Sequence, residues 1–196
     1  MTKQGKKRNL SFSPGGFAGM TTTTVTQILF TRYEKTGDSY LAEHFSYEIS
    51  MLGFADSKID GLIPERNGFE REGNESKQRE CNAEINLALE TFVMHWRALI
   101  EFFYDDRKEK KCSDDMRAYD FVDRSKWEKA RGNMPSWIRN LNRRAGKEMA
   151  HLTSSRKYGT PPEKNWPYKD MKKHLEAIIA LFAKEANLQI SKEDKN

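Results

Sequence analysis

Apolar side chains recur at helical intervals over much of this chain. The most regular stretch spans residues 76–104, where an apolar residue returns every three or four positions and so stays on one face of a helix. Its apolar positions are Ile85, Leu89, Phe92, Trp96, Leu99 and Phe103. We therefore expect a long helix here, with one face in a hydrophobic core.

The same spacing predicts two further amphipathic helices. One covers residues 39–54 and follows the sequence TGDS, a good helix N-cap, while the other covers 168–186 after a proline-rich turn at 158–167. Their apolar positions are Leu41, Phe45, Ile49 and Leu52 in the first helix, and Tyr168, Met171, Leu175, Ile178, Phe182 and Ala186 in the second.

Glycine, proline and dense charge separate these helices. Residues 56–75 are rich in glycine and charge and predict a long loop, and the run DDRKEKKCSDD predicts a second loop. The sequence MRAYDFV then begins a short helix. Another short helix begins near Ser125 and ends before Gly132 and Pro135.

These elements predict an all-α protein, a bundle of about four to six helices. Residues 21–187 suit a single domain, because 196 residues are enough for one buried core. Residues 1–20 carry four basic side chains, no acid and little apolar periodicity, so we expect a disordered basic tail. Residues 188–196 are expected to be frayed.

Cysteine content and hydropathy indicate the cellular compartment of the protein. Cys81 and Cys112 form no CxxC pair and have no metal-ligand spacing, so we expect neither a disulfide framework nor a metal site. The sequence shows no secretory signal and no apolar run of the roughly 18 residues that cross a membrane. A cytoplasmic protein without a membrane partner is the expectation.

Positive charge concentrates in one segment. The net charge is only +5, but residues 131–160 contain seven basic side chains and one acid. Clustered lysine and arginine displace counterions from phosphates, so a polyanion is the natural partner. The alternative is a solvated helix face with no partner.

The centre of that segment is LNRRAGKEMAHLTSSR, residues 141–156. On a helix, Arg144 and His151 lie about 20° apart at the edge of the apolar face, and Glu148 can pair with Arg144 one turn away. The predicted apolar face consists of Ile138, Leu141, Ala145, Met149 and Leu152. A partly desolvated edge of this kind suits imidazole and guanidinium chemistry.

Three stretches together resemble small bacterial proteins of the HEPN superfamily. They are ETFVMHWRALIEFFYDD, DDMRAYDFV and RRAGKEMAHLTSSR, and the last contains an arginine, six residues and a histidine. The resemblance implies a helical bundle, a homodimer that brings two motifs together, and in many members an endoribonuclease that needs no metal or other cofactor. A toxin or phage-defence role would add an antitoxin or another operon partner.

If the protein cleaves RNA, each polar residue of the motif has a role. His151 would transfer protons and Arg144 would stabilise the phosphate while the ribose 2′-OH attacks. Three more basic residues, Arg143, Lys147 and Arg156, would position the RNA backbone. Glu148 and Glu90 would support this site.

A catalytically silent helical module that binds nucleic acid, nucleotide or a partner protein is the alternative function. In that case Arg144 is only the ion-pair partner of Glu148, and His151 is a capping or packing histidine. We interpret His95 as a packed structural residue because it lies among apolar neighbours on its helix. The four tryptophans could stack on bases but are more typical of a core.

Overall fold

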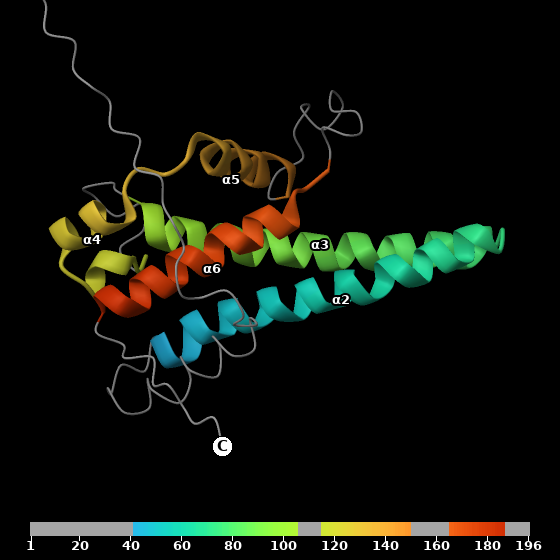
Figure 1. Ribbon diagram of the computed structural model, residues 1–196, viewed down its shortest axis with the longest axis horizontal. Coiled ribbons are helices and arrows are strands. Elements are labelled where there is room, and N and C mark those ends of the chain that lie inside the picture. The colour runs from blue at the N-terminus through green and yellow to red at the C-terminus, as the bar shows by residue number, and fades with distance from the viewer. Residues whose placement is uncertain (1–40, 106–114, 150–164, 187–196) are drawn as a thin grey trace, which may run out of the picture.

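The computed structural model describes residues 41–105, 115–149 and 165–186, and all regular structure in these ranges is helical. This confirms the all-α class. Seven elements follow one another along the described chain (Figure 1). They are a π-helical turn η1 (Leu41–Phe45), α2 (Ser46–Arg71), α3 (Glu75–Tyr104), a 3₁₀ turn η2 (Ala118–Asp120), α4 (Arg124–Arg131), α5 (Ser136–Glu148) and α6 (Tyr168–Glu185).

The two longest helices, α2 and α3, form an antiparallel hairpin (Figure 1). Gly73 makes the turn with a φ of +68°, a left-handed conformation that favours glycine. Asn74 caps α3, since its side chain accepts a hydrogen bond of 3.2 Å from the Lys77 N–H. The long helix predicted at 76–104 is thus confirmed as α3.

The loop predicted over residues 56–75 is wrong, because α2 continues without interruption to Arg71. Ile59 in this stretch is only 1% exposed. Packing of α2 along α3 outweighs the poor helix propensity of glycine and proline, and Pro64 lies inside the helix on its exposed side. The helix predicted at 39–54 is therefore the first half of a longer element.

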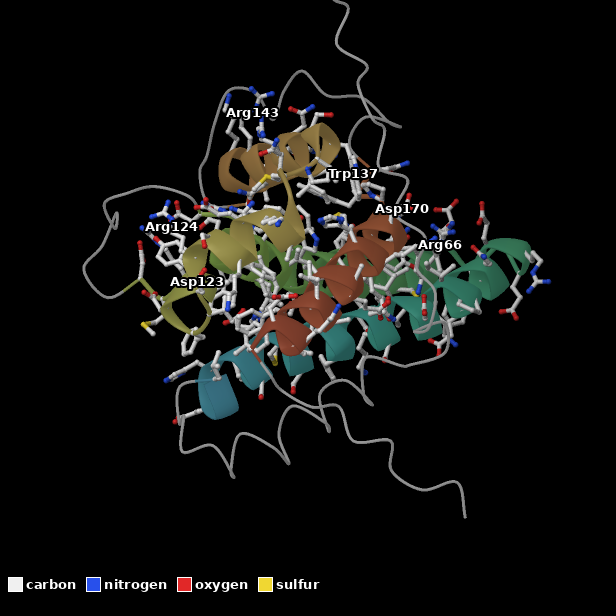
Figure 2. The ribbon with its side chains drawn as sticks, turned by 60° about the vertical axis from the view of Figure 1, so that its left-hand side comes forward. Arg66, Asp123, Arg124, Trp137, Arg143 and Asp170 are labelled. Atoms are coloured by element: carbon white, nitrogen blue, oxygen red, sulfur yellow. The ribbon has the colours of Figure 1, made fainter. Side chains whose placement is uncertain are left out.

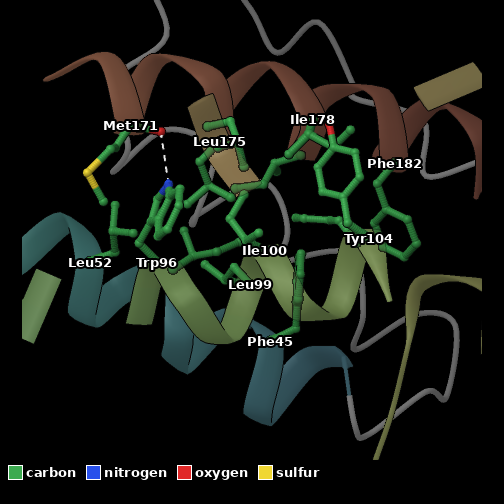
Figure 3. Packing of buried hydrophobic residues seen from close by; sticks show 14 of the residues in the cluster. Phe45, Leu52, Trp96, Leu99, Ile100, Tyr104, Met171, Leu175, Ile178 and Phe182 are labelled. Atoms are coloured by element: carbon green, nitrogen blue, oxygen red, sulfur yellow. Dashed lines mark hydrogen bonds between the residues drawn. The ribbon is translucent and has the colours of Figure 1, made fainter. Parts of the chain in front are cut away.

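The core lies where α6 packs against one end of the hairpin (Figure 3). Trp96 of α3 is fully buried and its indole N–H donates to the Met171 carbonyl of α6 at 3.2 Å. Trp127 of α4 is also buried and donates to the Phe103 carbonyl at 3.0 Å. Each buried indole satisfies its donor, so both contribute apolar area without an unpaired polar group.

The short elements confirm part of the sequence prediction. The helix expected in MRAYDFV is a single 3₁₀ turn, η2, and the one expected near Ser125 is α4. Asp123 caps α4, and Gly132 follows it with a φ of +67°. Both predicted tails lie outside the described residues, as do most of the charged loop and most of the proline-rich turn.

Candidate functional site

The helix α5 carries the motif and packs against the bundle through a narrow apolar face. Ile138 and Ala145 are fully buried, while Leu141 and Met149 are half-buried. This confirms the predicted face within the described residues, and Leu152 lies outside them.

A glycine allows α5 to approach α3 closely. A Cβ atom added at Gly146 would lie 3.3 Å from the Nη1 atom of Arg97 on α3. The Arg97 guanidinium is held there by Glu101, with an Nε to Oε1 distance of 3.0 Å. Because Gly146 has no side chain, α5 can lie directly against the Arg97 guanidinium of α3. The sequence did not reveal this role of Gly146.

The solvent-facing side of α5 contains no acid. Its exposed residues from Ser136 to Glu148 are basic, amide, hydroxyl or tryptophan side chains. They are Ser136, Trp137, Arg139, Asn140, Arg143 and Lys147. In Figure 2, Arg143 extends from the outer side of α5, whereas Trp137 lies on the side that faces α6.

The one acid of α5, Glu148, is half-buried and paired with Arg144. The Arg144 Nε lies 2.9 Å from both carboxylate oxygens of Glu148. This confirms the predicted i,i+4 pair, and it removes the only negative charge on α5 from competition with an approaching polyanion.

Arg144 also holds the start of α6. Its Nη1 donates to the Asn165 carbonyl at 2.9 Å, and its guanidinium carbon lies 4.0 Å above the Trp166 ring. With a side chain only 17% exposed, Arg144 connects α5 to the segment before α6 through a salt bridge, a hydrogen bond and a cation–π contact.

Some of the other predicted site residues lie in the described part of the chain, and the rest lie outside it. Arg143 and Lys147 are exposed on α5, as an RNA-binding role requires. Glu90 is exposed on α3, and among the described residues no hydrogen bond or ion pair connects it to α5. His151 and Arg156 lie outside the described residues, so the spacing between Arg144 and His151 stays a feature of the sequence.

A second polar cluster lies where α3, α4, α5 and α6 meet. The Tyr104 hydroxyl is 3.2 Å from His174 Nε2, and the two rings stack at 6.0 Å. Trp137 contacts the same imidazole at 5.6 Å with the rings nearly perpendicular, and Arg131 lies over the Tyr104 ring. Four separate helices supply these residues, so no local spacing could have indicated the cluster.

Burial sets the protonation of this pair. It raises the pKa of the Tyr104 hydroxyl, although the charge of Arg131 opposes the rise. Burial also lowers the pKa of His174. Both side chains are therefore neutral near pH 7, and the cluster presents polar but uncharged rings behind Trp137.

His95 is packed between the hairpin helices. Its Nδ1 is 2.8 Å from Glu48 Oε2, and its ring contacts Tyr47 edge to face. This agrees with the structural role expected from its neighbours.

In the described part of the chain, no three or more histidine, cysteine or acidic side chains are grouped as metal ligands, and no helix has the length and apolar content needed to cross a bilayer. Comparisons with protein-family models, curated proteins and solved structures gave no match to this chain.

Proposed function

We propose that this protein binds single-stranded RNA across the exposed side of α5. The observation that carries the proposal is the absence of any acid among the exposed residues of that helix, in a chain where acids and bases are otherwise nearly balanced. RNA, rather than another polyanion, is the ligand that the resemblance to HEPN proteins favours.

The spacing of the basic residues supports a backbone contact. Arg139, Arg143 and Lys147 recur every four residues, so they follow a row that turns by about 40° and rises by about 6 Å per step. That rise is close to the distance between successive phosphates of an extended strand. Side chains in such a row bind phosphates without reading sequence.

Charge reversal on α5 tests the proposal. We expect the double variant Arg143→Glu/Lys147→Glu to lose most of its affinity for an unstructured RNA in a fluorescence anisotropy titration. In the parent protein three phosphate contacts predict that log K falls with log salt with a slope of about −2, and Arg143→Ala should reduce the slope by about 0.7.

A matched control exists at the far end of the hairpin. Lys77 and Arg79 are both exposed, and Lys77→Glu/Arg79→Glu changes the net charge by the same amount. Equal loss of binding in the two double variants would mean that net charge alone attracts RNA. Parent-like binding by the α5 variant would overturn the proposal.

Endoribonuclease activity is the second candidate function, and the Arg144 and His151 spacing within the HEPN-like stretches is what favours it. The phosphate-facing group would be Arg144, which Glu148 and Trp166 hold in one orientation, and His151 would transfer protons. A homodimer, and a toxin or defence role with an operon partner, belong to this candidate.

Cleavage has a specific chemical signature. We expect RNA to be cut in EDTA, to leave cyclic phosphate ends, and to resist where the attacking 2′-OH is replaced by hydrogen. His151→Ala should lower the rate by 10² to 10⁴. Cleavage of the deoxy substrate would exclude this chemistry, and binding without cleavage by the parent would leave RNA binding as the function.

A further inference from the structure

We infer that Trp137 stacks on a nucleobase of the bound RNA, so that α5 recognises an unpaired strand by base stacking as well as by charge. This inference rests on the proposed RNA binding at the same helix. It adds a second kind of contact, an aromatic one, near the N-terminal end of α5 and to one side of the basic row.

Burial and contacts separate the four tryptophans. Trp96 and Trp127 are fully buried, and each donates its indole N–H to a backbone carbonyl. Trp166 is half-buried beneath the Arg144 guanidinium. Trp137 is 41% exposed, although a tryptophan exposes a large apolar area at a cost in free energy. Trp137 is therefore the tryptophan with ring surface to offer a ligand.

The neighbours of Trp137 hold its ring on an ordered support. His174 contacts the indole at an interplanar angle of 73°, and His174 is itself stacked on Tyr104. A ring fixed by such packing loses little conformational entropy when a base stacks on it.

The exposed Asn140 lies between Trp137 and the basic row on an oblique path across α5. Asn140 is exposed one turn after Trp137 and about 60° around the helix, and Arg143 follows at the next step. By helix geometry, Trp137 and Arg143 are about 9 Å apart along the axis and about 120° apart around it, so a strand that contacts both must run obliquely across the helix past Asn140. We expect such an oblique strand to place a base on Trp137 and its phosphates on Arg143 and Lys147.

Substitution of the ring tests the stacking contact. Trp137→Ala should weaken binding of single-stranded RNA by roughly 5- to 150-fold. The salt slope should stay that of the parent, because no charge is removed. Trp137→Leu keeps apolar contact with His174 but has no aromatic face, so it should weaken binding similarly while preserving the thermal midpoint. Phe54→Ala, which removes an aromatic side chain 58% exposed on α2, is the matched control and should bind like the parent.

Two other ligands make the test specific. An oligonucleotide with abasic sites throughout retains its phosphates, so the parent and Trp137→Leu should bind it equally. Duplex RNA hides its bases in the stack and should give the same equality. If Trp137→Leu binds single-stranded RNA like the parent while Arg143→Glu/Lys147→Glu does not, stacking is wrong and RNA binding by α5 stands. If neither variant loses affinity, the proposed function fails as well.

Discussion

A structural role and a phosphate-binding role require different positions of the Arg144 side chain. As a phosphate-binding group it would need to reach solvent, yet its side chain is 17% exposed and contacts Glu148, Asn165 and Trp166. These contacts give it a structural role in the ligand-free protein, whatever its role in chemistry.

The structural role predicts a loss of stability. Arg144→Ala should lower the free energy of unfolding by about 1–3 kcal/mol in a urea titration, because it removes the cation–π contact with Trp166, the hydrogen bond to Asn165 and the salt bridge to the half-buried Glu148. Arg144→Lys should recover only part of this loss, since lysine cannot make the same planar contacts. Unchanged stability in Arg144→Ala would show that the connection to α6 contributes nothing.

His174 predicts a pH dependence of stability. Burial lowers its pKa below the ordinary value of about 6.5, so below that pH the unfolded chain binds a proton that the folded chain resists. Stability should therefore fall as the pH drops from 7.5 towards 5, and His174→Gln should flatten part of this fall in thermal melts. Its neighbours Tyr104 and Trp137 carry no charge in this range. A variant with the parent's pH slope would contradict the prediction.

At the scale of elements, sequence periodicity predicted the helices that bury a regular face and missed the extent of α2. The apolar positions of α3 and α6 repeat without interruption, so each helix could be placed within a few residues. In α2 the repeat weakens after Leu52, and Gly61, Pro64 and Gly68 favour a loop. Only α3, whose partner surface is invisible in a local window, makes this stretch helical.

If packing against α3 holds α2 helical despite Pro64 and Gly61, replacing these residues should stabilise the protein. Pro64 is exposed inside α2, where proline removes a backbone hydrogen bond, so Pro64→Ala should raise the free energy of unfolding by about 1–3 kcal/mol. Gly61→Ala is the companion variant, since a Cβ there meets nothing within 4 Å, and it should gain up to about 1 kcal/mol. Urea titration and amide hydrogen exchange at residues 60–68 measure both. No gain from either variant would contradict a continuous α2.

At the scale of the whole molecule, the all-α class and the basic surface of α5 were predictable, because both follow from local sequence. The Tyr104, His174 and Trp137 cluster was not, since tertiary packing brings its residues together over a span of 70 positions. The support of Arg144 by Asn165 and Trp166 was hidden for the same reason. The homodimer stays a prediction, and the exposed apolar side chains Tyr47, Phe54, Leu87 and Met94 on the hairpin are candidates for its contact.

The position of the core at one end of the hairpin has a consequence for how the chain can be divided. Beyond Ile59 on α2, and before Phe92 on α3, only Cys81 is fully buried, so the turn at Gly73 is remote from the main core. The chain could be split there into two pieces, the first carrying α2 and the second carrying α3 to α6. Each piece would present half of an apolar interface to the other, while the contacts of α5 with α3 and with the segment before α6 would lie within the second piece. This protein is thus suited to two-fragment complementation.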